Sequence, residues 1–283
     1  MSLPNRRRDI WPEVRSDVEA PIGVFDSGVG GLTVLRTLMK RLPNEHTVYL
    51  GDTARVPYGT RSGEVVTRYA LLSARHLASH GIKLLVVACN TVSAHSLPAL
   101  ADALPIPVVG VIEPGAQAAA ARSKGGAIAV LGTPTTIASG AYQAALRRLA
   151  PLATVVARAC PLFVPLAEEG WLDGDVPRLV AEQYLLDLRR IGVDTAVLGC
   201  THYPLLARTI ADVLGPRVAI VDGADATAEA VASLMAARDL LRPSGAAVRH
   251  RTLCTDVPDR FRAVAERFLG RPVERVELVD LQP

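Results

Sequence analysis

The chain has 283 residues, of which 49% are hydrophobic and 4% aromatic, enough apolar material for one large domain or two ordinary ones. Its 31 basic and 28 acidic residues are interspersed, so we expect no nucleic-acid partner. No apolar run approaches the roughly 18 residues of a membrane span, and we expect no membrane association. Four cysteines without an export signal fit a reducing, cytoplasmic location better than a disulfide framework.

The first twenty residues are polar and include Arg6, Arg7 and Arg8. They contain no apolar segment long enough for a signal peptide. We therefore expect residues 1–20 to be a flexible N-terminal extension and assign it no function.

From Ile22 onward, short aliphatic runs alternate with longer helical patterns. The predicted strands are Ile22 to Phe25, Val48 to Leu50, Leu84 to Ala88, Val108 to Val111, Ala127 to Leu131, Thr154 to Ala157, Thr195 to Leu198, Val218 to Val221 and Val248 to Leu253. Alternation of this kind is typical of parallel strands joined by crossover helices. The sequence therefore predicts an α/β fold with largely parallel sheets.

Small polar residues follow most of these strands, at the edge where such sheets bind ligands. Leu84 to Val87 leads into Ala88-Cys89-Asn90-Thr91, and Ala196 to Leu198 leads into Gly199-Cys200-Thr201-His202. This weak internal symmetry predicts two pseudo-symmetric α/β domains with the active site in the cleft between them. Turn signals at Pro114-Gly115 and after Asp222 divide the chain into 21–115 plus 224–283, and 116–223.

Cys89 and Cys200 occupy matching strand-to-helix junctions, where a helix N-terminus favours a thiolate. A single buried cysteine is most often a packing residue, and we interpret Cys160 and Cys254 in that way. The pair could be a redox couple, a metal site, a supported nucleophile, or an acid and a base acting on opposite faces of a substrate.

Spacing separates these alternatives. The chain has no Cys-x-x-Cys, which argues against thioredoxin-like chemistry, and Cys89, Cys200 and His202 supply only three ligands for a metal. Inversion at carbon needs one base and one acid on opposite faces, which two symmetric halves supply. Asp26 and His202 are candidate proton partners, although a helix-capping aspartate and a buried structural histidine explain them about equally well.

Gly28-Val29-Gly30-Gly31 does not fit the dinucleotide-binding pattern, because position 33 is Thr33. A tight strand-to-helix turn explains these glycines better. Neutral hydrogen-bond donors close to the strand ends suit a small, multiply charged amino acid. These donors are Asn90, Thr91, Thr133, Thr136 and Thr201.

With these residues assembled, the sequence resembles the glutamate racemases of the aspartate/glutamate racemase superfamily. The resemblance covers nearly the whole chain from Ile22. It rests on IGVFDSGVGGLTVL (22–35), GDTARVPYG (51–59), ACNT (88–91), CPLFVPLAEEG (160–170) and LGCTHYPLL (198–206).

The resemblance implies an amino-acid racemase without pyridoxal phosphate, metal or other cofactor, in which Cys89 and Cys200 are the catalytic acid and base. It implies that Asp26 and His202 are their partners and that Glu168 assists Cys200. Family membership further implies a homodimer that supplies D-glutamate for peptidoglycan. The implied substrate-binding residues are Asp26, Ser27, Tyr58, Gly59, Asn90, Thr91, Thr133, Thr136, Thr201 and His202.

Three alternatives stay open at this point. An aspartate racemase or related superfamily racemase would differ in pocket depth, which the sequence does not show. A non-catalytic binding protein on the same fold would not need a matched acid/base pair. A zinc-binding interaction module would hold metal in the purified protein.

Overall fold

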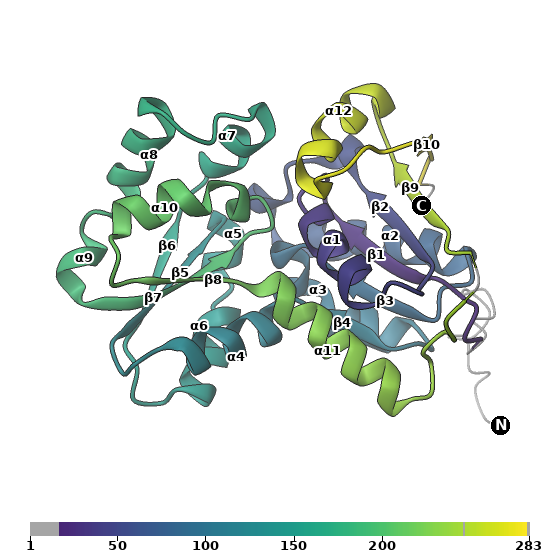
Figure 1. The fold of residues 1–283 in the computed structure, drawn as a ribbon, viewed down its shortest axis with the longest axis horizontal. Helices are drawn as coiled ribbons and strands as arrows, with labels where there is room; N and C mark the ends of the chain where they lie inside the picture. Colours follow the sequence, from purple (N-terminus) through teal and green to yellow (C-terminus); the bar gives the residue numbers. More distant parts are fainter. Residues whose placement is uncertain (1–16, 246, 282–283) are drawn as a thin grey trace.

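The computed structural model describes residues 17–245 and 247–281, whose strands form two fully parallel sheets (Figure 1). The six-stranded sheet contains β1 (Ile22–Asp26), β2 (Thr47–Gly51), β3 (Leu84–Val87), β4 (Val108–Gly110), β9 (His250–Cys254) and β10 (Val276–Leu278). The four-stranded sheet contains β5 (Ala127–Gly132), β6 (Val155–Ala159), β7 (Val193–Gly199) and β8 (Ala219–Asp222). The predicted α/β class with parallel sheets is confirmed.

Helices and short turns connect the strands. The α-helices are α1 (Leu32–Arg41), α2 (Gly63–Ser79), α3 (Asn90–Ala103), α4 (Ile112–Arg122), α5 (Pro134–Ala138), α6 (Ala141–Leu149), α7 (Phe163–Glu169), α8 (Asp175–Leu185), α9 (Leu188–Ile191), α10 (Ala207–Leu214), α11 (Gly223–Ala237) and α12 (Pro258–Leu269). The 3-10 turns are η1 (Thr53–Arg55), η2 (Tyr58–Thr60) and η3 (Tyr203–Leu206). Central strands such as β1, β2, β3 and β5 are buried at every position, as helices on both faces of a parallel sheet require.

The two sheets repeat one strand order. The order β2-β1-β3-β4 within the six-stranded sheet matches β6-β5-β7-β8 in the four-stranded sheet, and β9 and β10 extend the first sheet beyond β2. Cys89 follows β3 and Cys200 follows β7, so the two thiols lie at equivalent places. The internal symmetry expected from the two cysteine motifs is therefore present in the topology.

All nine predicted strands are present, with ends shifted by one or two residues. The sequence reading missed β10 (Val276–Leu278), a three-residue edge strand that pairs only with β9. Its single alternation of apolar and charged residues is too short to give a periodic signal.

The proposed division into domains stays a prediction. Its first boundary, at residue 115, falls inside α4, and its second, at residue 223, falls at the start of α11. Residues 1–16 of the expected N-terminal extension, including Arg6 to Arg8, lie outside the described residues. Of the remaining four, the Val18 carbonyl accepts a hydrogen bond from Lys83 and Glu19 pairs with Arg242 at 2.7 Å.

Within the described ranges, no helix is long and apolar enough to cross a membrane.

A glycine turn brings the two sheets together. The Tyr49 hydroxyl donates to the Gly28 carbonyl at 2.8 Å and fixes the turn after β1. A side chain at Gly30 would collide with Thr201 Oγ1 and His202 Nδ1 beyond β7 of the other sheet. Thr33 Oγ1 also donates to the Thr201 carbonyl at 3.2 Å. The missing side chain at Gly30 thus lets the two strand-end loops touch.

A buried ion pair lies near the amino ends of β2 and β3, opposite the cysteine end of the six-stranded sheet. Lys83 Nζ lies 2.6 Å from Glu45 Oε2, with side-chain exposures of 0% and 2%. Glu45 Oε1 also accepts a hydrogen bond from the Arg242 backbone at 2.7 Å. Removing one member of such a pair leaves the other charge buried without compensation.

We expect Lys83→Met to lower the free energy of unfolding by about 3–5 kcal/mol, measured by urea denaturation. The control is Arg41→Met, which removes an exposed ion pair with Glu229 and should leave the midpoint almost unchanged. Equal midpoints for the two variants would contradict a stabilising role for the buried pair.

Candidate active site

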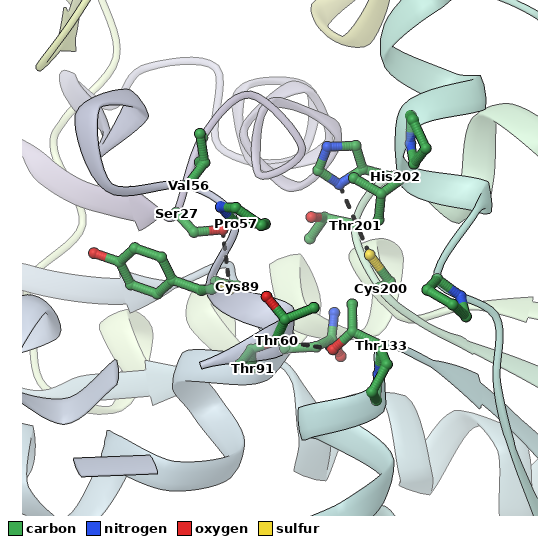
Figure 2. A pocket seen from close by; sticks show the side chains of 18 of the residues that line it. Ser27, Val56, Pro57, Thr60, Cys89, Thr91, Thr133, Cys200, Thr201 and His202 are labelled. Carbon is green, nitrogen blue, oxygen red and sulfur yellow. Dashed lines mark hydrogen bonds between the residues drawn. The ribbon is translucent and has the colours of Figure 1, made fainter. Parts of the chain in front are cut away.

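A cavity of about 400 Å³ lies where the carboxyl ends of the two sheets face each other (Figure 2). Of the thirteen site residues predicted from the sequence, eleven line it, and Asp26 and Thr136 do not. These eleven residues are Ser27, Tyr58, Gly59, Cys89, Asn90, Thr91, Thr133, Glu168, Cys200, Thr201 and His202.

Cys89 is held at the N-terminus of α3 by the end of β3. It is 6% exposed, and its Sγ lies 3.5 Å from Ser27 Oγ. Burial, followed by the negative charge of Asp26, raises the pKa of Cys89 to about 12. In the free protein this cysteine is therefore a neutral thiol at pH 7.

Cys200 lies on the opposite side of the cavity (Figure 2) and has a different environment. Its Sγ is 3.7 Å from His202 Nδ1, and His202 Nε2 is 2.9 Å from Glu168 Oε1. Cys200 precedes the four-residue turn η3 and not a long helix, so the helix-dipole argument made from the sequence applies less to Cys200 than to Cys89. The polar group beside the Cys200 sulfur is instead the His202 imidazole.

His202 carries the positive charge of the cavity. Burial alone would lower its pKa, but hydrogen bonds to Cys200 and Glu168, with their charges, outweigh burial and raise the pKa to about 10. Burial would raise the pKa of Glu168, but the hydrogen bond and charge of His202 lower it. At neutral pH, His202 is an imidazolium between a carboxylate and the Cys200 sulfur.

Asp26 lies behind the cavity wall. It is 1% exposed, its Oδ2 accepts a hydrogen bond from the Gly28 backbone at 2.8 Å, and its Oδ1 has no hydrogen-bond partner among the described residues. Burial raises the pKa of Asp26, against the opposing charge of His202. Asp26 acts on Cys89 through its charge, and its role as a proton partner stays a prediction.

Three threonine hydroxyls form a closed cluster at the wall. Thr91 Oγ1 lies 3.0 Å from both Thr133 Oγ1 and Thr136 Oγ1, and the last two are 2.9 Å apart. Thr91 and Thr133 line the cavity, whereas Thr136 is fully buried and supports them from behind. Thr135, a close competitor in sequence, instead donates to the Arg61 carbonyl.

Sequence reasoning missed several residues that shape the site. Tyr142 donates to Asn90 Oδ1 at 2.8 Å, which leaves the Asn90 amide nitrogen free to donate elsewhere. The motifs offered no signal for Tyr142, because it lies on α6, away from the strand ends. Tyr142 does not line the cavity itself; the lining residues that were not predicted are Gly28, Val56, Pro57, Thr60, Pro134, Pro161, Val164 and Pro165.

Comparison with known proteins identifies the class. Residues 22–231 match the Asp/Glu/Hydantoin racemase family, and the chain belongs to it. In the described residues, no group of three or more His, Cys, Asp or Glu side chains is arranged to hold a metal ion.

Within that family, the similarity is to glutamate racemases, as the sequence motifs predicted. The chain is 56% identical to glutamate racemase of Geobacter metallireducens over 261 residues, 92% of this chain and 97% of the relative. The structure of the Francisella tularensis glutamate racemase in complex with D-glutamate superposes with a TM-score of 0.87 at 37% identity, covering 93% and 98% of the two chains. The structure of the Thermus thermophilus glutamate racemase superposes with a TM-score of 0.85 at 48% identity, covering 94% of this chain and 98% of the other.

The raised pKa of His202 predicts a pH-dependent contribution to stability. The folded protein holds this proton more tightly than the unfolded chain, so the stabilisation is fully present below about pH 6.5 and is lost as pH rises toward the folded value of about 10. We expect the difference in unfolding free energy between wild type and His202→Asn to shrink over that window, measured by urea denaturation.

The matched control is His250→Asn. Burial, followed by the charge of Arg271, lowers the pKa of His250 to about 4, so its contribution should be constant above about pH 7. A difference for His202→Asn that stays flat between pH 6.5 and 10 would contradict the charged state assigned to His202.

Proposed function

We propose that the protein interconverts L- and D-glutamate by moving the α-proton between Cys89 and Cys200. The observation that carries the proposal is the placement of the two thiols on opposite sides of one cavity, at equivalent ends of β3 and β7. The names of the relatives, and the D-glutamate bound in the Francisella structure, support glutamate as the substrate.

In the proposed reaction, one cysteine, as a thiolate, removes the α-proton of the substrate. The electron pair of the broken C–H bond stays on the α-carbon. The opposite cysteine, as neutral thiol, then donates its proton to the other face. The two cysteines begin the cycle in unlike environments, because Cys89 is a neutral thiol and an imidazolium lies beside Cys200. For the reverse direction, the two cysteines exchange roles.

The α-carbon beside a carboxylate is a weak acid, so the site must stabilise developing negative charge with preorganised donors. Among the described residues that line the cavity, none is a lysine or an arginine. We propose that hydroxyl, amide and backbone N–H donors bind the substrate carboxylates, helped by the N-terminus of α3. The proposed binding residues are Asp26, Ser27, Tyr58, Gly59, Asn90, Thr91, Thr133, Thr136, Thr201 and His202, with Asp26 and Thr136 acting from behind the wall.

An aspartate racemase is the second candidate within the family. The relatives named above favour glutamate, and a cavity of about 400 Å³ has room for the longer side chain. A non-catalytic binding protein would not need a relay of polar contacts from Cys200 through His202 to Glu168.

The proposal extends to the cellular role. A glutamate racemase in a bacterium supplies D-glutamate for peptidoglycan, and we propose that the protein works in the cytoplasm as a homodimer. Family membership supports the peptidoglycan role and the dimer, and the cysteine content supports the location. Size-exclusion chromatography with light scattering tests the dimer.

We expect Cys89→Ser and Cys200→Ser each to lower kcat/KM for glutamate racemisation by at least about a hundredfold, measured by circular dichroism at saturating and limiting substrate. A serine hydroxyl is a far weaker acid than a thiol at neutral pH, so neither variant can complete the proton relay.

The matched control is Cys254→Ser, which changes a buried cysteine outside the cavity and should retain most activity. Wild-type activity in either cavity variant would overturn the two-thiol mechanism. If glutamate is inert with folded, reduced wild type and aspartate is racemised, the second candidate replaces the first.

A further inference from the structure

The C-terminal helix α12 approaches the catalytic relay from the other sheet. It follows β9 of the six-stranded sheet, whereas α7, which carries Glu168, follows β6 of the four-stranded sheet. Figure 1 shows both helices at the top of the view, one in each half of the molecule. Side chains of α12 therefore contact α7, a helix that belongs to the other sheet.

Arg267 of α12 binds the end of α7. Its Nη1 donates to the carbonyls of Glu168 and Ala167, the latter at 3.4 Å. The last carbonyls of a helix lack partners within the helix and carry its negative dipole end, which favours a cation. A Cβ at Gly170 would lie 2.7 Å from Arg267 Cζ, so the glycine leaves room for the guanidinium group.

Glu168, whose backbone carbonyl binds Arg267, also binds His202 through its carboxylate. Glu168 Oε1 is 2.9 Å from His202 Nε2. Glu168 is 36% exposed on its side chain, so burial alone does not fix it. Because Arg267 binds the Glu168 carbonyl, it fixes the backbone from which the Glu168 carboxylate extends.

Phe268, the next residue of α12, contacts His202 directly. The two rings are 5.2 Å apart with an interplanar angle of 77°, and Phe268 is fully buried. An edge-to-face contact of this kind limits rotation of the imidazole. The titratable and charged groups around His202 are Cys200, Glu168 and Asp26, with Arg260 acting on Glu168.

We propose that Arg267 and Phe268 are positioning residues that align the Glu168–His202 pair with Cys200 from across the cavity. The proposal rests on the proposed function for its catalytic consequence. It implies that the relay of Cys200 is assembled only while the two sheets hold their present arrangement, whereas the groups beside Cys89 are Ser27 and the carboxyl of Asp26.

The test compares Arg267→Ala with Arg262→Ala, a matched arginine on the same helix whose nearest ion pair is with Asp259 at 4.0 Å. The first readout is the pKa of His202 by NMR, with His202→Asn used to assign the signal. We expect Arg267→Ala to lower this pKa by about one unit or more toward its ordinary value, and Arg262→Ala to leave it unchanged.

The second readout is the pH profile of alkylation by iodoacetamide, measured separately for the two cysteines by peptide mass spectrometry. In Arg267→Ala we expect the profile of Cys200 to shift and that of Cys89 to stay the same. We also expect kcat/KM to fall roughly tenfold to a hundredfold, with Arg267→Lys between Arg267→Ala and wild type.

An unchanged His202 pKa and Cys200 profile in Arg267→Ala would overturn the proposal, as would an equal shift in Arg262→Ala. If Arg267→Ala does not fold, Arg267→Lys and Phe268→Leu provide the same comparison. Failure of the proposed function shows separately, as absence of racemisation in wild type, and leaves the NMR and alkylation readouts intact.

Discussion

The hydrogen-bonded pair of His202 and Glu168 sets the charge of the whole cavity. Of the described lining residues, only His202 can carry a positive charge, and its Nε2 lies 2.9 Å from the Glu168 carboxylate. Because the wall is otherwise neutral or acidic, the imidazolium determines which sulfur faces a positive neighbour. Cys200 therefore lies beside a cation, whereas Cys89 lies near the carboxyl of Asp26.

The fold is nearly symmetric, but the chemistry built on it is not. Both sheets repeat one strand order and place a cysteine after the equivalent strand. On one side, burial and then the charge of Asp26 raise the pKa of Cys89 and keep it neutral, and on the other, side chains from α7 and α12 contact His202. A reaction that runs equally well in two directions needs two thiols, but at any moment it needs them in different protonation states.

Much of the fold followed from the sequence because buried parallel strands are continuous aliphatic runs, and β10 escaped because it is short and at an edge. The strand-end residues Cys89 and Cys200 were predictable from position alone. Glu168 came only from the family resemblance, since a glutamate near the end of a helix has no local signal. Tyr142, Arg267 and Phe268 were not predictable, because each acts through a contact distant in sequence.

The most direct test of two opposed thiols is the fate of deuterium when L-glutamate is converted in heavy water, followed by NMR and chiral separation at early times. Because each thiol serves one face, the account predicts that newly formed D-glutamate is deuterated at the α-carbon while the remaining L-glutamate keeps its proton. Equal deuteration of both enantiomers from the start would indicate a single base and would contradict the account.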